Sequence, residues 1–145
     1  MKTCIKQLQF RGFKSFNKKI DVVFQPGLNC VMGPNGSGKS NVLDGLCFIL
    51  GRLSSKDLRA DNFADLLFKR KGAIAAEGEV AIVLDNSSKI FPMEDKLIEI
   101  KRKIKKTGQT QFKINGRNST RTQAMDLLAI ARIFPDGHNI ILQGD

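Results

Sequence analysis

The sequence has 145 residues, about the length of one ordinary domain, and 41% of them are hydrophobic, which is enough for a packed core. No stretch approaches the roughly 20 consecutive apolar residues of a membrane span, and Lys2 and Lys6 interrupt the start, where a signal peptide needs an apolar run. We therefore expect a soluble, cytoplasmic protein with no membrane partner. The formal charge of +10 favours a polyanionic partner, of which nucleic acid is the commonest.

The N-terminal region is predicted to consist of antiparallel strands. Residues 3–10 alternate partly between apolar and polar side chains, and residues 19–24 place Ile20, Val22 and Phe24 on one face, as strands with one buried face do. Residues 28–32 form a short, mostly apolar run, which is typical of a strand buried on both faces. The cysteines lie far apart in apolar segments without metal-binding spacing, so we expect buried, reduced thiols at Cys4, Cys30 and Cys47.

A glycine-rich segment, residues 33–40, follows the strand predicted at residues 28–32, and a helix is predicted after it. Apolar residues recur at helical spacing across residues 42–50, and Gly51 suits the position just past a helix C-terminus. A shorter helix is expected across residues 61–67, with Leu67 on its apolar face.

The second half of the chain is predicted to begin with a strand and a hairpin. Residues 79–84 alternate as a strand, and residues 97–105 and 110–115 form two strands of a hairpin. In this hairpin the isoleucines face one way and three lysines face the other: Lys101, Lys103 and Lys105. We expect the lysine face to be mostly solvated, with contact to DNA as the alternative.

Turn and capping signals follow the hairpin. Asn115-Gly116 marks a tight turn, and Thr120-Arg121-Thr122-Gln123 fits a capping box. The helix behind this box places apolar residues of 124–131 on one stripe. A last apolar strand, residues 140–142, ends shortly before the chain does, so we expect the chain to be a piece of a longer protein.

One segment matches a phosphate-binding loop, G-x-x-x-x-G-K-S/T, in full. It reads Gly33-Pro34-Asn35-Gly36-Ser37-Gly38-Lys39-Ser40. Three anionic phosphates need several backbone N–H groups to converge on them, and glycines let the backbone curl that tightly. The helix predicted to begin near Gly38 adds its free N–H groups and the positive end of its dipole. We expect Lys39 to reach the β- and γ-phosphates and the hydroxyl of Ser40 to ligate Mg²⁺.

The loop alone does not distinguish kinases, GTPases, helicases and transporter-type ATPases. Two features narrow the choice. A β-rich region precedes the loop, whereas nucleotide kinases usually start with the strand before it. About 100 residues after the loop, an apolar strand delivers Gln143, whose carbonyl could ligate Mg²⁺ and position a water. Gln143 can equally be interpreted as an ordinary polar strand end.

Other segments extend this pattern well beyond the loop. In chain order they are Gly12-Phe13-Lys14-Ser15-Phe16, Asn41, Asp44-Gly45-Leu46-Cys47-Phe48-Ile49-Leu50-Gly51, Leu58-Arg59-Ala60, Asp65-Leu66-Leu67-Phe68 and Pro135-Asp136-Gly137-His138-Asn139-Ile140-Ile141-Leu142-Gln143-Gly144-Asp145. Together they resemble the N-terminal part of an SMC (structural maintenance of chromosomes) ATPase head of archaeal or bacterial type. The resemblance covers essentially the whole chain and is far more specific than the loop.

The resemblance implies an α/β fold, the N-terminal lobe of an ABC-type P-loop NTPase. This lobe has a mixed sheet around the P-loop helix and an antiparallel β-subdomain. It also implies that residues 1–145 are the N-terminal half of an SMC head, without the coiled coil, hinge and C-terminal lobe.

The resemblance further implies roles for individual residues. Lys39 and Ser40 keep the roles given above, and Asn41 extends the nucleotide-binding segment. Gln143 matches a glutamine that ligates Mg²⁺ and senses the γ-phosphate. Arg59 lies where the family places an arginine finger, although from the residues alone it is a solvated charge at a helix end. Lys14 lies in a segment that the family places near the nucleotide.

Two parts of the family's catalytic machinery are missing from the sequence: an LSGG-type signature and an apolar strand ending in Asp-Glu. In SMC proteins both come from the C-terminal half. The implied activity is hydrolysis of ATP to ADP and phosphate, with Mg²⁺, in a dimer that sandwiches nucleotide between two heads. The implied partners are the chain's own C-terminal lobe, a second SMC head, a kleisin-type subunit and chromosomal DNA in the nucleoid. We expect the isolated chain to bind ATP weakly and to hydrolyse almost none.

Three alternatives remain open on the sequence. The first is the related double-strand-break repair ATPase, which shares the head architecture. The second is a small P-loop kinase that phosphorylates an acceptor unaided. The third is a basic DNA-binding module in which nucleotide has only a structural role.

Overall fold

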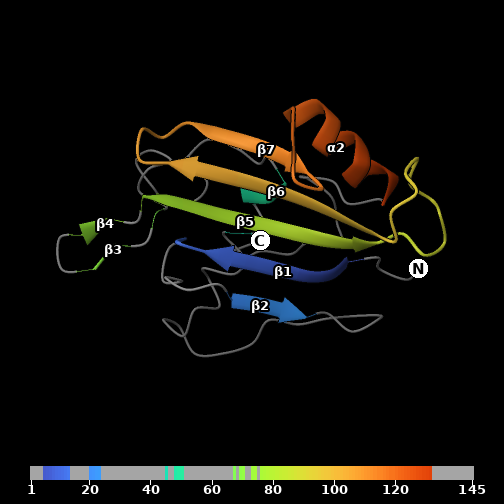
Figure 1. Cartoon of the computed structure of the whole chain (residues 1–145), viewed down its shortest axis with the longest axis horizontal. Coiled ribbons are helices and arrows are strands. Elements are labelled where there is room, and N and C mark those ends of the chain that lie inside the picture. The colour runs from blue at the N-terminus through green and yellow to red at the C-terminus, as the bar shows by residue number, and fades with distance from the viewer. Residues whose placement is uncertain are drawn as a thin grey trace, which may run out of the picture.

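A computed structural model describes residues 5–13, 20–23, 45, 48–50, 67, 69–70, 73–74 and 76–131. The largest element in this part of the chain is a six-stranded sheet with strand order β2-β1-β5-β6-β7-β8, in which every pairing is antiparallel (Figure 1). Its strands are β1 (Ile5–Arg11), β2 (Ile20–Val23), β5 (Glu77–Asp85), β6 (Leu97–Lys105), β7 (Thr110–Ile114) and β8 (Arg117–Ser119). A helix, α2 (Arg121–Ile130), follows β8.

The alternation that predicted the strands matches the buried face of the sheet. On β1, Leu8 and Phe10 have no exposed surface. On β5, the same is true of Val80, Ile82 and Leu84. Phe10 pairs with Val80, and Leu8 pairs with Ile82, so both strands present their apolar residues to one core. The strands predicted at 3–10, 19–24 and 79–84 are confirmed at the described positions.

The hairpin predicted from residue 97 onward is confirmed as β6 and β7. A second tight turn, Asn115-Gly116, joins β7 to β8, and the φ angles of these two residues are 49° and 82°. A two-residue turn with both φ angles positive matches the right-handed twist of its strands, and this accounts for the Asn-Gly pair.

The predicted capping box at the start of α2 is also confirmed. The backbone N–H of Gln123 donates to the Thr120 hydroxyl at 3.2 Å, and the Thr120 N–H donates to the Gln123 side chain at 3.2 Å. The helix buries Ala124, Leu127 and Leu128. No helix in the described part of the chain is long and apolar enough to cross a membrane.

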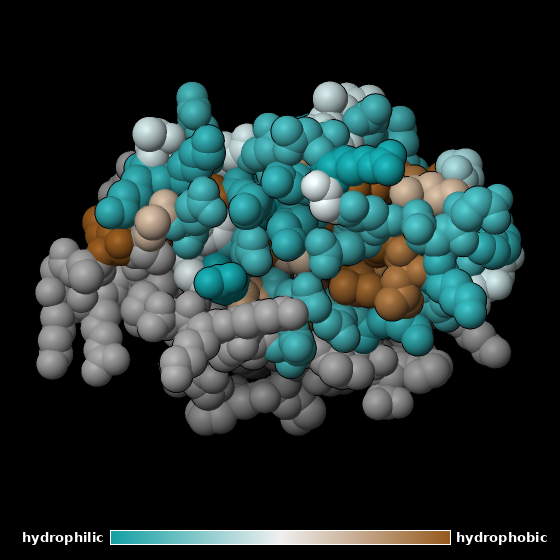
Figure 2. Space-filling model, viewed as in Figure 1, coloured by the Kyte–Doolittle hydropathy of each residue, from teal (hydrophilic) through white to brown (hydrophobic). Residues whose placement is uncertain are grey.

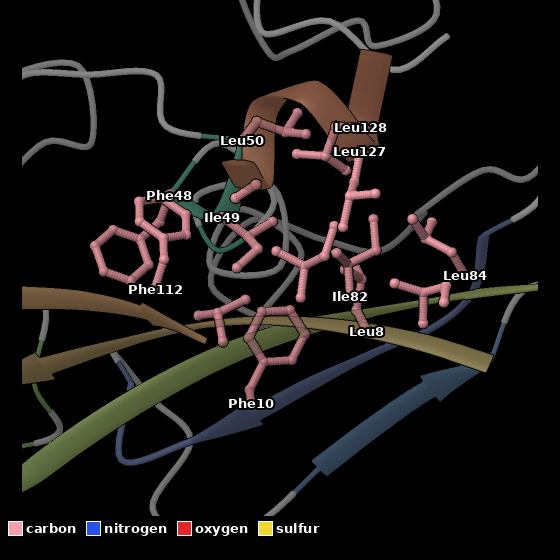
Figure 3. Close-up of a cluster of buried hydrophobic side chains, with 14 of the residues drawn as sticks. Leu8, Phe10, Phe48, Ile49, Leu50, Ile82, Leu84, Phe112, Leu127 and Leu128 are labelled. Atoms are coloured by element: carbon pink, nitrogen blue, oxygen red, sulfur yellow. The ribbon is translucent and has the colours of Figure 1, made fainter. Parts of the chain in front are cut away.

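The core lies between the inner face of the sheet and the helical segments that cover it (Figure 3). Leu8, Phe10, Ile82 and Leu84 come from the strands, and Leu127 and Leu128 come from α2. Residues 48–50, which follow the glycine-rich loop in the sequence, also belong to this cluster.

The prediction of a short helix across residues 61–67 is wrong at its last residue. Leu67 forms an isolated antiparallel bridge with Phe13 instead. A small hairpin that we did not predict follows it, made of β3 (Lys69–Arg70) and β4 (Ala73–Ile74). Short apolar runs suit a helix or a strand equally by spacing, and here packing against Phe13 decides. Residues 61–66, and the strands predicted at 28–32 and 140–142, lie outside the described residues.

Candidate nucleotide-binding site and its supporting face

The residues predicted to bind nucleotide and magnesium lie outside the described residues. They are Lys14, Gly33, Pro34, Asn35, Gly36, Ser37, Gly38, Lys39, Ser40, Asn41, Arg59 and Gln143. Their arrangement around a nucleotide therefore stays a prediction. The structure does describe the end of the helix predicted after the loop: Gly45, Phe48 and Ile49 are helical, and Leu50 lies in a turn. The predicted helix is thus confirmed at these positions.

Gly45 brings this helix unusually close to the sheet. A Cβ atom built on Gly45 would lie 2.1 Å from Cε1 of Phe10 and 2.9 Å from its Cδ1. Neither carbon could tolerate that distance, because non-bonded carbons rest about 3.5–4.0 Å apart. Any other residue at position 45 would push the helix away from β1 or displace a fully buried ring. This contact, five residues after Ser40, fixes how near the helix lies to the sheet.

Phe48 makes the second contact between the helix and the sheet. Its ring centroid is 5.6 Å from that of Phe13 at an interplanar angle of 36°, and Phe13 is in turn 6.3 Å from Phe10. All three rings are fully buried. Tilted rings at these distances attract one another beyond the area that they bury. The aromatic cluster therefore ties the end of the helix to the end of β1.

Arg102 contributes a third contact, which the sequence analysis missed. It lies on the inner face of β6, only 7% exposed, between Ile100 and Ile104. Its Nη1 donates to the backbone carbonyl of Phe48 at 2.9 Å. The signal was present in the sequence: the alternation that turns the isoleucines inward also turns position 102 inward.

Burial lowers the pKa of Arg102 to about 10, with the charge of Arg121 as a smaller cause. The guanidinium is therefore still protonated at neutral pH. Two aromatic faces offset part of its lost hydration, since its central carbon lies 4.3 Å from the Phe48 ring centroid and 5.0 Å from that of Phe112. Figure 3 shows Phe48 and Phe112 at the same end of the core.

The lysine face of the hairpin is confirmed as the outer face of β6, but acidic side chains accompany it. Lys101 lies 3.7 Å from Glu79 and 3.6 Å from Glu99, and Lys103 lies 3.5 Å from Glu77. On the face of the molecule seen in Figure 2, the surface of the described residues is mostly hydrophilic. These ion pairs reduce the local positive charge, which favours a solvated face over the DNA-binding alternative for these two lysines.

Known sequences that resemble this chain belong to one family. The family described as RecF/RecN/SMC N terminal domain matches residues 4–136. The chromosome partition protein Smc of Pyrococcus furiosus is 42% identical over 144 residues, covering 97% of this chain and 12% of that protein. The protein of the same name from Mycobacterium leprae is 36% identical over 142 residues, with the same two shares. The chain thus spans only 12% of the length of these relatives.

Solved structures that resemble this chain come from the same family as the relatives found by sequence. One is the Smc head domain of Pyrococcus furiosus with an extended coiled coil, bound to the C-terminal domain of ScpA. It has a TM-score of 0.89 and 41% identity, covering 100% of this chain and 37% of that one. Another, from work on ATP-driven dimerization and DNA-stimulated activation of SMC ATPases, has a TM-score of 0.88 and 42% identity, covering 97% and 87%. These relatives confirm the predicted α/β fold of an SMC head lobe.

Proposed function

Because this chain belongs to the family of RecF/RecN/SMC N-terminal domains, we propose that it is the ATP-binding half of an SMC head that acts in chromosome organisation. The observation that carries the proposal is the complete phosphate-binding pattern of residues 33–40, followed by a helix whose Gly45 rests directly on Phe10. A loop of this kind needs a helix held firmly behind it, since the catalytic effect of such loops comes from positioning.

The donor set at the proposed site suits a magnesium-bound triphosphate. Backbone N–H groups of the glycine loop would face the phosphates, and Lys39 would contribute a positive charge near the β- and γ-phosphates. The Ser40 hydroxyl and the Gln143 side-chain carbonyl are oxygen ligands of the kind that Mg²⁺ prefers. When bound, Mg²⁺ would neutralise charge on the β- and γ-phosphate oxygens.

Three further residues complete the proposed site. Arg59 supplies a positive charge for the phosphoryl-transfer transition state, a role that in other NTPases is worth roughly 10³–10⁵ in rate. In the proposed site, Lys14 and Asn41 would lie beside the nucleotide. Hydrolysis of ATP to ADP and phosphate requires the C-terminal lobe and a second head, which supply the groups that this chain lacks.

The proposed partners follow from the same assignment. The ScpA-bound relative supports a kleisin-type subunit, and the relative from work on ATP-driven dimerization supports a second head. The net charge of +10 supports DNA as a ligand of the whole assembly. We place this assembly on the nucleoid in the cytoplasm.

ATP turnover in a complete head, this chain joined to its C-terminal lobe, tests the proposal. The complete head should hydrolyse ATP, the isolated chain should hydrolyse almost none, and Lys39→Ala should abolish the activity. Lys106→Ala is the matched control, because Lys106 is an exposed turn residue and its loss should leave turnover unchanged. Turnover by the isolated chain that disappears in Lys39→Ala would show that the chain hydrolyses ATP without its C-terminal lobe, which contradicts the proposal. Equal turnover in both lysine variants of the complete head would rule out the glycine loop as the site.

A further inference from the structure

Arg102 is a charged residue in a position where the pattern of the strand demands an apolar one. Its neighbours on the inner face of β6, Ile100 and Ile104, are fully buried, and Arg102 itself is 7% exposed. Taking a guanidinium out of water is costly, and an apolar residue of similar volume often serves stability as well or better. Stability alone therefore does not account for an arginine here, and its contacts point to another role.

Two sets of contacts hold the guanidinium, one from β7 and one from the end of the helix. On the β7 side, Nη2 donates to the Thr110 hydroxyl at 3.2 Å, and the Phe112 ring lies beneath the cation. On the other side, Nη1 donates to the Phe48 carbonyl at 2.9 Å and the cation lies over the Phe48 ring. The sheet thus holds the guanidinium in place, and the guanidinium holds Phe48.

The carbonyl that Arg102 binds lies at the end of a helix. Ile49 is the last helical residue described there, and Leu50 is already in a turn. The last four carbonyls of a helix have no partner within the helix, and they carry the negative end of its dipole. A buried cation that donates to one of them holds that end by charge as well as by geometry.

A helix held at two points along its length has a fixed position and rotation. Gly45 fixes the distance between the helix and β1 through Phe10, while Arg102 fixes the end at Phe48 from β6. In the predicted helix, Ser40 precedes Phe48 by eight residues, roughly 12 Å along the axis. Over that length a helix moves as a stiff rod, so a displacement at Phe48 would reach its first turn.

We propose that Arg102 is a positioning residue for the nucleotide site: by holding the Phe48 carbonyl, it sets the axial position of the helix that is predicted to begin near Gly38 and to carry Lys39 and Ser40. The inference rests on the function proposed above. Arg102 itself touches neither nucleotide nor metal in this role. It acts through the helix, and it makes the placement of the phosphate-binding groups depend on the β6–β7 hairpin.

The test uses the complete head and measures kcat, the KM for ATP and the urea midpoint of each variant. Arg102→Met keeps much of the volume and removes the bond to the Phe48 carbonyl. It should lower kcat at least about tenfold, because misplacement of reacting groups by 1 Å can cost about 100-fold. The KM should change less than kcat, because groups placed for the transition state affect kcat most.

Two further variants separate positioning from stability. Arg102→Lys keeps a cation that can donate to one partner but loses the planar, stacked guanidinium, so it should recover kcat only part of the way from Arg102→Met to wild type. Leu84→Ala truncates a fully buried side chain at the other end of the core from Phe48 and leaves the contacts of Arg102 in place, so it should lower the urea midpoint with kcat within about twofold. If Arg102→Met does not fold, Arg102→Gln, whose side chain is shorter than arginine, replaces it with the same expected fall in kcat.

Three results would overturn the inference. The first is a wild-type kcat in a folded Arg102→Met or Arg102→Gln head. The second is a fall in kcat in Leu84→Ala as large as that in Arg102→Met at an equal loss of stability. With either result, loss of turnover in Lys39→Ala would show that the proposed function still stands. The third is a wild-type head without ATP turnover, which would overturn the proposed function and this inference together.

Discussion

Gly45→Ala tests the close contact between the helix and β1, and its cost can be worked from the structure. The new Cβ would lie 2.1 Å from Cε1 of Phe10, so the two groups must separate by about 1.4 Å to reach ordinary contact. Overpacking of this kind costs about 1–3 kcal/mol. The cost should fall in the upper part of that range because Phe10 is fully buried. Alanine is a better helix former than glycine by roughly 0.8–1.0 kcal/mol, which leaves a net loss of about 1–2 kcal/mol.

Urea unfolding of the complete head measures this loss, and a double-mutant cycle assigns it to the contact. Leucine at position 10 lacks Cε1 and Cζ, two of the three ring atoms nearest the new Cβ. Gly45→Ala should therefore cost about 1 kcal/mol less in a Phe10→Leu background than in wild type. The reasoning is refuted if Gly45→Ala leaves the free energy of unfolding unchanged, or if its cost is the same in both backgrounds.

Three further predictions concern the described residues. Gly116→Ala should lower the free energy of unfolding in urea by about 1 kcal/mol, because its φ angle of 82° strains any other residue although the space around it is open. Gly12→Ala should cost clearly more, because its φ angle is also positive and its Cβ would lie 2.4 Å from a backbone oxygen. Equal costs would contradict this. Thr120→Ala should lose about 1 kcal/mol by removing the helix cap, and Thr120→Ser should lose little; equal losses would exclude capping as the cause. Hydrogen bonds from Ser87 lower the pKa of Asp85 below 3.8, so its stabilisation is complete above that pH and is lost as the pH falls through the folded-state value. Asp85→Asn should therefore flatten that part of the acid-unfolding curve, and an unchanged curve would contradict the assignment.

The strands and turns were predictable because their causes are local. The alternation of Val80, Ile82 and Leu84 reports one buried face, and the Asn115-Gly116 pair reports a turn with positive φ angles. The capping box of α2 is confirmed for the same reason, since both of its hydrogen bonds join residues three apart.

The features that the sequence analysis missed depend on contacts between distant segments. Strand alternation already turns Arg102 inward, but only the fold brings Phe48, 54 residues away in the sequence, into contact with it. Leu67 suits a helix by spacing, but Phe13 pairs with it as a bridge. Gly45 was recognised as part of a resemblance, while its physical reason, the Phe10 ring, appears only in the fold.

The candidate site was predictable in its residue types, because the chemistry of phosphate binding restricts them strongly. Converging backbone amides, one lysine and one hydroxyl at fixed spacing identify the loop from the sequence alone. The structure adds what spacing cannot give, namely the contacts at Gly45 and Phe48 that hold the helix behind the loop.

Calorimetric titration of the complete head with Mg·ATP tests most directly whether the glycine loop holds a triphosphate. The wild-type head should give saturable heat, and Lys39→Ala should lose it while keeping the wild-type urea midpoint. A wild-type head that gives no heat, or a Lys39→Ala head that binds as tightly as wild type, would contradict the account.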